Sequence, residues 1–147
     1  MISRFWDIRT SKPTSTQTYS SPIASFDRSP DSAVLSLCTG NTIHFLSPNN
    51  TPISSHTLAY APSCASLHPN GGTYVTGSED GWIRVHSADG QGDAKENELY
   101  KGHHGRVHSC LYSPDGELFA SGSEDGTIRL HQDKPKTYGS VSSKRQR

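Results

Sequence analysis

The chain repeats one hairpin pattern at a spacing of about 40 residues, and this period restricts the fold more than any other feature. Residues 71–87 and 115–132 share an identical turn, Gly-Ser-Glu-Asp-Gly, which follows a β-rich segment and precedes an alternating one. Two such segments joined by a short Gly/Asp turn indicate a β-hairpin. A weaker copy spans residues 30–47, and residues 2–7 match the end of the other copies. The sequence therefore predicts a series of β-hairpins.

The period of the copies identifies the kind of repeat. Equivalent positions are 40, 40 and 45 residues apart, at Trp6, Leu46, His86 and His131. A period of about 40–45 residues with four short strands per unit is typical of the blades of a β-propeller. The extra residues of the last step fall in Ala88–Asn97, whose Gly, Asp and Glu content predicts a surface loop.

We therefore predict an all-β propeller fragment of about three four-stranded antiparallel blades plus a leading strand pair. The expected segments are the end of a preceding blade and a Ser/Thr-rich loop (1–22), a degenerate blade (23–60), a blade with an acidic loop (61–101), a full repeat (102–132), and a basic Ser-rich tail or outer strand (133–147). Ser11–Ser21 is expected to be a long loop, or alternatively a poorly formed outer strand. Because propellers have about four to eight blades, we expect a truncated product, a partial gene model or a chain that needs partners.

Composition argues against several classes of protein. The net charge is zero, which gives no sign of nucleic acid or a membrane as a bulk partner. Cys38, Cys64 and Cys110 are odd in number and lack a CxxC pair, so neither a disulfide framework nor a zinc site is expected. They are interpreted as small buried residues in a reduced compartment. No apolar run approaches the roughly 18 residues of a membrane span.

The residue types of catalytic and metal sites occur in the chain, but their spacing favours structural roles. His103, His104 and His108 lack the further ligands of a zinc site, so we expect no metal or cofactor. The adjacent carboxylates at 79–80 and 124–125 sit on tight turns and point apart, unlike the pair of a hydrolase. Ser, His and Asp occur in the last repeat, but residue types alone do not define a triad, and no GxSxG elbow is present. We therefore expect neither an enzyme nor a small-molecule substrate.

Residues 102–132 resemble a WD40 repeat from end to end. They contain the Gly102-His103 opening, the Ser-Pro-Asp-Gly turn at 113–116, and the run Ser-Gly-Ser-Glu-Asp-Gly-Thr-Ile-Arg-Leu at 121–130. Phe5-Trp6-Asp7 supplies the Trp-Asp ending of that family. The segments 99–103, 113–130 and 136–139 also resemble the last blade of the serine/threonine kinase receptor-associated (unr-interacting) protein family. The i subunit of eukaryotic initiation factor three, whose final blade is similar, is the alternative.

This resemblance implies a seven-bladed, non-catalytic scaffold that binds other proteins of a multiprotein complex. It further implies a place in the survival-of-motor-neuron complex, which assembles spliceosomal ribonucleoproteins for mRNA splicing, and roles in receptor-kinase signalling and translation. Location in the cytoplasm and the nucleus is expected because the sequence has neither a membrane span nor the apolar region of a secretory signal within residues 1–10.

The resemblance also implies a hydrogen-bonded tetrad within each blade, made of His, Ser or Thr, Asp and Trp. The matching residues of the last repeat are His103, Ser121, Asp125 and, in place of Trp, His131. The middle repeat keeps only Thr76 and Asp80, with Leu58 where His is expected, and the first keeps no clear member. We therefore expect at most one complete network of this kind.

The C-terminal segment is basic and Ser-rich. Its cations are Lys134, Lys136, Lys144, Arg145 and Arg147. They are candidates for contact with RNA or a partner, or for a nuclear signal, while the structural alternative is a solvated, frayed terminus. Any RNA association is expected to be mainly indirect.

Overall fold

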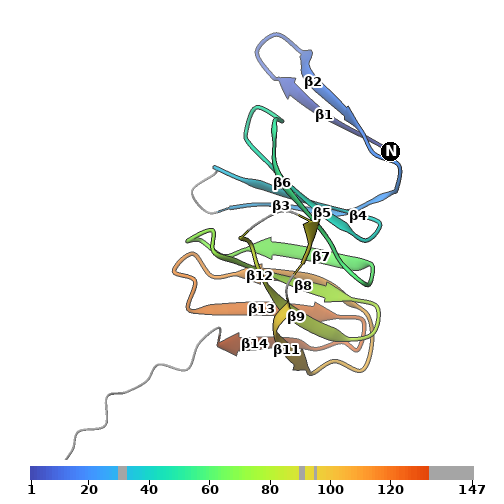
Figure 1. Cartoon of the computed structure of the whole chain (residues 1–147), viewed down its shortest axis with the longest axis vertical. Helices are drawn as coiled ribbons and strands as arrows, with labels where there is room; N and C mark the ends of the chain where they lie inside the picture. Colours follow the sequence, from blue (N-terminus) through green and yellow to red (C-terminus); the bar gives the residue numbers. More distant parts are fainter. Residues whose placement is uncertain (30–32, 90–91, 95, 133–147) are drawn as a thin grey trace, which may run out of the picture.

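The computed structural model describes residues 1–29, 33–89, 92–94 and 96–132. These residues form β-strands without any helix, and the strands lie in four sheets stacked along the long axis of the molecule (Figure 1). Among them, no helix has the length and hydropathy needed to cross a membrane. The predicted all-β fold is confirmed.

The four sheets follow one another in sequence order. The first is a hairpin of β1 (Ile2–Asp7) and β2 (Lys12–Thr18). The second contains β3 (Ile23–Arg28), β4 (Leu35–Thr39), β5 (Thr42–Leu46) and β6 (Pro52–Thr57), with the short β10 (Gly92–Asp93) on its outer edge. The third contains β7 (Pro62–Leu67), β8 (Thr73–Ser78), β9 (Trp82–Ser87) and β11 (Glu96–Lys101). The fourth contains β12 (Val107–Tyr112), β13 (Leu118–Ser123) and β14 (Ile128–Gln132).

Two segments differ from the sequence-based expectation. The loop expected at Ser11–Ser21 is wrong, because β2 pairs antiparallel with β1, as the outer-strand alternative required. Thr residues at every second position of β2 favour a strand, and Pro13 is tolerated because β2 is an edge strand. The loop expected at Ala88–Asn97 is wrong in part, since it contains β10 and the start of β11. The last sheet has three strands among the described residues, and the outer strand considered for 133–147 lies outside them.

Apolar side chains fill the spaces between the second, third and fourth sheets. Between the second and third sheets lie Cys38, Ile43, Phe45, Leu58, Ala65, Leu67 and Tyr74. Between the third and fourth lie Cys64, Val75, Ile83, Val85, Val107, Cys110, Tyr112 and Phe119. All three cysteines are free thiols within these layers, and burial raises the pKa of Cys38 to about 12. The sheets therefore pack face to face, as propeller blades do.

The inner strands β3, β7 and β12 are joined across sheets by a hydrogen-bonded relay. The Ser66 hydroxyl of β7 donates to Asp27 Oδ2 of β3 at 2.7 Å. The same hydroxyl oxygen accepts the backbone N–H of Tyr112 in β12 at 3.2 Å. Ser66 is buried, so each sheet's position is linked to that of the next through a group shielded from water.

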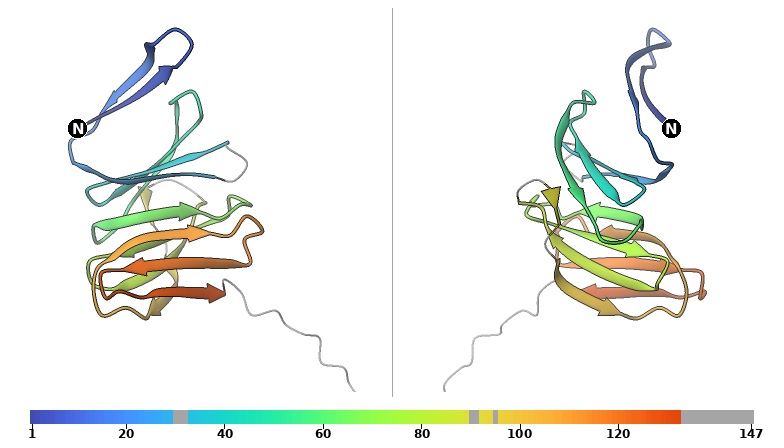
Figure 2. Two further views of the ribbon diagram at one scale, coloured as in Figure 1. Left: turned by 180° about the vertical axis from the view of Figure 1, so that it is seen from behind. Right: turned by 45° about the vertical axis from the view of Figure 1, so that its right-hand side comes forward.

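The first hairpin stands apart from the other sheets in every view (Figures 1 and 2). Two hydrogen bonds connect β2 to Asn50: Gln17 Nε2 donates to the Asn50 carbonyl at 2.5 Å, and Asn50 Nδ2 donates to Ser15 Oγ at 2.7 Å. A largely apolar cavity of about 400 Å³ lies between β1 and the second sheet and reaches Phe26 and Leu35. The hairpin is thus attached mainly through polar contacts at its outer strand.

Candidate functional site

The four residues singled out in the last repeat lie on separate elements that meet along the fourth sheet, from the β13–β14 turn to the far end of β14. His103 lies in the loop before β12, Ser121 in β13, Asp125 in the turn between β13 and β14, and His131 in β14. His103 Nε2 is 2.8 Å from Ser121 Oγ, and His103 Nδ1 is 3.1 Å from Asp125 Oδ2. Ser121 Oγ is also 3.1 Å from His131 Nε2. All four side chains therefore form one hydrogen-bonded chain.

The chemistry of the partners gives this chain a direction. An ionised carboxylate only accepts hydrogen bonds, so His103 Nδ1 carries a proton toward Asp125. With the proton at Nδ1, His103 accepts the Ser121 hydroxyl proton at Nε2, and Ser121 Oγ accepts from His131 Nε2–H. With this assignment every bond has one donor and one acceptor.

The Gly-Ser-Glu-Asp-Gly turn places Asp125 for this role. Gly126 has φ +78°, a left-handed conformation that glycine adopts without strain. Asp125 accepts from the Thr127 hydroxyl at 2.7 Å, from the His104 N–H at 3.0 Å and from the Thr127 N–H at 2.9 Å. The Thr127 hydroxyl and these N–H groups, together with His103, hold the pKa of Asp125 well below its usual range. The carboxylate is therefore ionised and fixed in the turn.

The other end of the network is packed between aromatic rings. The His131 ring stacks on Phe119 with 4.8 Å between ring centroids, and Tyr100 contacts it edge-on at 5.4 Å. Burial, followed by the nearby His103 and Arg129, lowers the pKa of His131. A neutral imidazole thus takes the place of the Trp that the resemblance implies.

The distances between Ser121, His103 and Asp125 match those of a Ser-His-Asp triad, but the surroundings differ from those of an active site. Ser121 is only 1 % exposed and His103 only 4 %. The Ser121 hydroxyl is engaged by both His103 and His131, which leaves no free approach to it. In the described part of the chain, no cluster of His, Cys, Asp and Glu is arranged to hold a metal ion. The arrangement is suited to fixing a turn and a loop.

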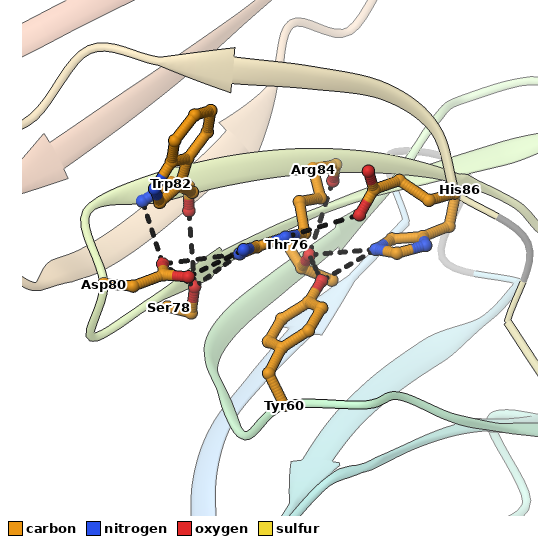
Figure 3. A network of polar contacts seen from close by, with 8 residues as sticks. Tyr60, Thr76, Ser78, Asp80, Trp82, Arg84 and His86 are labelled. Atoms are coloured by element: carbon orange, nitrogen blue, oxygen red, sulfur yellow. Dashed lines mark hydrogen bonds and ion pairs between the residues drawn. The ribbon is translucent and has the colours of Figure 1, made fainter.

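The middle repeat contains a different network, shown in Figure 3. Thr76 and Asp80, the two residues named from the sequence, do not contact each other. Thr76 Oγ1 lies 2.6 Å from the Tyr60 hydroxyl and 3.3 Å from His86 Nε2. The Tyr60 hydroxyl lies 2.8 Å from His86 Nε2. Asp80 instead contacts Ser78, the Trp82 N–H and Arg84.

Arg84 joins the two halves of this network. Its guanidinium donates to Asp80 Oδ2 at 2.6 Å and lies over the Tyr60 ring, 4.2 Å from the ring centroid. A third contact, at 3.3 Å, is to Glu96 Oε2. Burial opposes the charge of Asp80, but hydrogen bonds from Arg84, Ser78 and Trp82 outweigh it and lower the pKa of Asp80 to about 2. Arg84 thereby supplies the link that a His would provide.

Tyr60 and Arg84 were not predicted from the sequence, because the repeat pattern places a His at a fixed position and neither residue occupies it. Leu58 does occupy the position expected for His, and it is buried in the apolar layer. Tyr60, two residues later, carries its hydroxyl to Thr76 instead. The signal available in the sequence was a Tyr close to the missing His, together with an Arg on the following strand.

The remaining candidates are distributed as follows. In the second sheet, Thr39 Oγ1 lies 3.0 Å from His44 Nε2. These two residues do not occupy the repeat positions of Ser121 and His131. His104 is exposed, and His108 Nε2 lies 3.8 Å from Glu124 Oε2. The basic residues of the C-terminal segment, Lys134, Lys136, Lys144, Arg145 and Arg147, lie outside the described residues.

The turns of the third and fourth sheets meet in a charged surface formed by Glu79, His104, Arg106 and Glu124, here called the turn surface. Arg106 Nη1 contacts Glu79 Oε1 at 2.9 Å, and its backbone N–H donates to Glu124 Oε1 at 3.0 Å. Arg106 therefore bridges the turns of adjacent sheets. The Glu79 side chain is 71 % exposed and that of Glu124 is 56 % exposed, so both carboxylates remain accessible.

Comparison with known proteins agrees with the repeated architecture. Residues 47–87 and 95–132 match the family model described as WD domain, G-beta repeat. The chain is 39 % identical over 111 residues to the serine-threonine kinase receptor-associated protein of Dictyostelium discoideum. It is 38 % identical over 111 residues to the proteins of that name from Homo sapiens and Bos taurus. These alignments cover 75 % of the chain but 36 % and 31 % of the relatives, so the chain spans about a third of their length.

Proposed function

The chain belongs to the WD40-repeat family, and from this membership we propose that it is a non-catalytic scaffold that holds partner proteins together. The observation that carries the proposal is the use of its polar residues. The Ser, His and Asp of the last repeat hydrogen-bond to one another in a buried network that fixes a turn, while the adjacent turn surface stays exposed. A rigid frame with accessible loops is what a docking protein requires.

A finer proposal concerns the partners. The relatives in Dictyostelium discoideum and Homo sapiens are named for association with a serine-threonine kinase receptor. We propose the same partner class for this chain, supported by the 39 % and 38 % identity. Assembly of spliceosomal ribonucleoproteins in the cytoplasm and nucleus, with the survival-of-motor-neuron complex, is the second part of this proposal. It rests on the likeness of the last repeat alone.

Affinity purification of the tagged full-length protein from cells tests the scaffold role. We expect a reproducible set of partner proteins that resists moderate salt. Charge reversal on the turn surface, E79K with E124K, is expected to lower recovery of at least one partner by about tenfold, a loss equivalent to about 1.4 kcal/mol. The matched control is E117K in the turn between β12 and β13, outside the turn surface. Recovery of no partner by the unmodified protein would overturn the proposal.

A further inference from the structure

Two of the three cysteines face each other across the apolar layer between the third and fourth sheets. Cys64 of β7 pairs with Gly77 of β8, and a Cβ built on Gly77 would lie 2.8 Å from Cys64 Sγ and 2.4 Å from Val107 Cγ1 of β12. The Cys64 thiol therefore points toward the fourth sheet. Cys110 lies in β12 with its Sγ 3.7 Å from the Val75 carbonyl oxygen of β8, so this thiol points toward the third sheet. Both residues are buried.

Strands β7 and β12 place the two cysteines at the same level. The two strands run in the same direction (Figure 2). Ser66 Oγ of β7 lies 3.2 Å from the backbone nitrogen of Tyr112 in β12, and each of these residues comes two positions after a cysteine. Side chains two positions apart share one face of a strand, so Cys64 and Cys110 meet one step earlier along the same pair of strands. A single serine side chain reaches the neighbouring backbone here, which is the close approach that a disulfide requires.

The two thiols are chemically unequal. Hydrogen bonds from the Cys110 thiol and the Gly77 N–H lower the pKa of Cys64, although burial acts in the opposite direction. The hydrogen bond to Cys64, followed by burial, raises the pKa of Cys110 well above its usual range. The thiolate is the reactive form of cysteine, and a second thiol beside an oxidised cysteine completes a disulfide. The pair therefore combines an attacking sulfur, that of Cys64, with a resolving one.

The layer between the second and third sheets holds a thiol without this arrangement. Its cysteine, Cys38, lies in β4. The repeat positions that correspond to Cys64 and Cys110 lie 39 and 45 residues earlier, the spacing of the proline turns, and hold Ser25 and Ala65. The facing thiols are therefore a feature of one layer and do not follow from the repeat pattern.

We propose that Cys64 and Cys110 form a reversible oxidation site, at which hydrogen peroxide converts the two thiols into a disulfide between β7 and β12. The Cys64 sulfur attacks one oxygen of the peroxide, the O–O bond breaks, one water leaves, and Cys64 becomes a sulfenic acid. The Cys110 sulfur then attacks the Cys64 sulfur, so that the S–S bond forms and the S–O bond breaks. The hydroxyl group leaves with the Cys110 proton as a second water. The two thiols thereby lose two electrons and two protons, and the peroxide is reduced to water.

This disulfide joins the third and fourth sheets covalently, where the reduced protein relies on non-covalent packing. It closes a loop from residue 64 to residue 110, which restricts the unfolded chain. The oxidised protein is therefore expected to unfold at a temperature about 10 °C higher than the reduced protein. The inference goes beyond the proposed scaffold function and does not depend on it.

The test uses the purified full chain in glutathione redox buffers, with a parallel series in hydrogen peroxide. Because the fold holds the two sulfurs together, half-oxidation of the folded protein is expected at a ratio of glutathione disulfide to glutathione squared at least tenfold lower than in urea. Peptide mapping of the peroxide-treated protein is expected to find Cys64 linked to Cys110 and to leave Cys38 as a free thiol. Equal ratios in the folded and the urea-treated protein would overturn the proposal.

Three variants identify the reacting pair. C64S and C110A introduce the residues that stand at the corresponding positions of the first repeat and the middle repeat, Ser25 and Ala65. Each is expected to abolish the disulfide and the rise in unfolding temperature, whereas the matched control C38S is expected to keep both. A cross-link that involves Cys38, its loss in C38S, or disulfides formed only between separate chains contradicts the proposal. The comparison of folded and urea-treated parent needs no variant, so it decides the question even where a substitution prevents folding.

Discussion

His103 uses both ring nitrogens within the protein, and this accounts for its burial. Its Nδ1 faces Asp125 at 3.1 Å and its Nε2 faces Ser121 at 2.8 Å. A buried imidazole with two satisfied nitrogens carries little desolvation cost, whereas the same ring with one lost partner carries a large one. The stability of the last sheet therefore depends on single side chains in this chain of contacts.

Replacing His103 with Ala is expected to lower the free energy of unfolding by about 1–3 kcal/mol, because it leaves buried groups without a partner. Chemical denaturation followed by tryptophan fluorescence measures the change. H108A is the matched control, since the His108 side chain is 56 % exposed, and a change below about 0.5 kcal/mol is expected there. A stable H103A protein that had lost an esterase activity of the parent would instead favour a catalytic triad.

The lowered pKa of Asp80 is expected to make the free energy of unfolding depend on pH. Its pKa falls from 3.8 to about 2 on folding, so the unfolded chain takes up the proton first. The stabilisation is complete above pH 4 and is lost as the pH falls toward 2. Because its side chain is 42 % exposed, solvent screening reduces the effect, and we expect D80N to cost about 1 kcal/mol at pH 7. Urea denaturation at pH 7, 4 and 2.5 should show the difference from the parent disappearing, and a constant difference would contradict this origin.

At the scale of the strands, the repeated turns made most of the fold predictable. Each Gly/Asp turn marks two strands, and the period then fixes the rest of the blade, as in β8–β9 and β13–β14. Strand β2 was missed because its Ser and Thr content suggested a loop, although alternate Thr residues favour a strand. Strand β10 could not be predicted from the sequence, because its pairing with β6 depends on how two blades pack against each other.

The candidate site was predictable only where the repeat is regular. His103, Ser121 and Asp125 occupy matching positions of a complete motif, so they could be named before the structure was known. Tyr60 and Arg84 make contacts that depend on side-chain length and direction across strands, which spacing does not encode. The middle repeat keeps the hairpin of the last repeat, but different residues, Tyr60 and Arg84, hydrogen-bond to its polar side chains.

Gly77 in β8 provides a test of the packing between the third and fourth sheets. A Cβ at this position would lie 2.4 Å from Val107 Cγ1 and 2.8 Å from Cys64 Sγ, so G77A is expected to destabilise the chain by about 1–3 kcal/mol through overpacking. The double variant G77A/V107A should recover part of the loss in thermal unfolding. G72A is the control, because its nearest neighbour is Asn70 Oδ1 at 3.4 Å. Equal effects of G77A and G72A would contradict close contact between the sheets.

At the scale of the whole molecule, the outward face of the fourth sheet exposes large apolar side chains to solvent. Leu111 of β12 is paired with Ala120 of β13, which is paired with Leu130 of β14, so all three share one face. Leu130 is 72 % exposed and Ile128 is 79 % exposed. An apolar patch beside a strand edge without a partner among the described residues favours association with other molecules.

The 147-residue chain is therefore expected to self-associate as its concentration rises. Light scattering coupled to size-exclusion chromatography should show this, and I128E with L130K should shift the protein toward the monomer. R129E is the control, because Arg129 lies between the two apolar residues and points to the opposite face. Association that is unchanged by I128E with L130K would show that another surface is responsible.

The separation of the first hairpin has a mechanical consequence. Among the described residues, two side-chain hydrogen bonds, both to Asn50, link the hairpin to the second sheet, whereas the later sheets share packed apolar layers. Under tension between residues 1 and 132, the hairpin is expected to come away first, as a discrete step before the stacked sheets give way. Freeing residues 1–22, the hairpin and its connection to β3, would lengthen the chain by up to about 75 Å. Force spectroscopy would record this as an early, low-force extension, and N50A would bring it to still lower force.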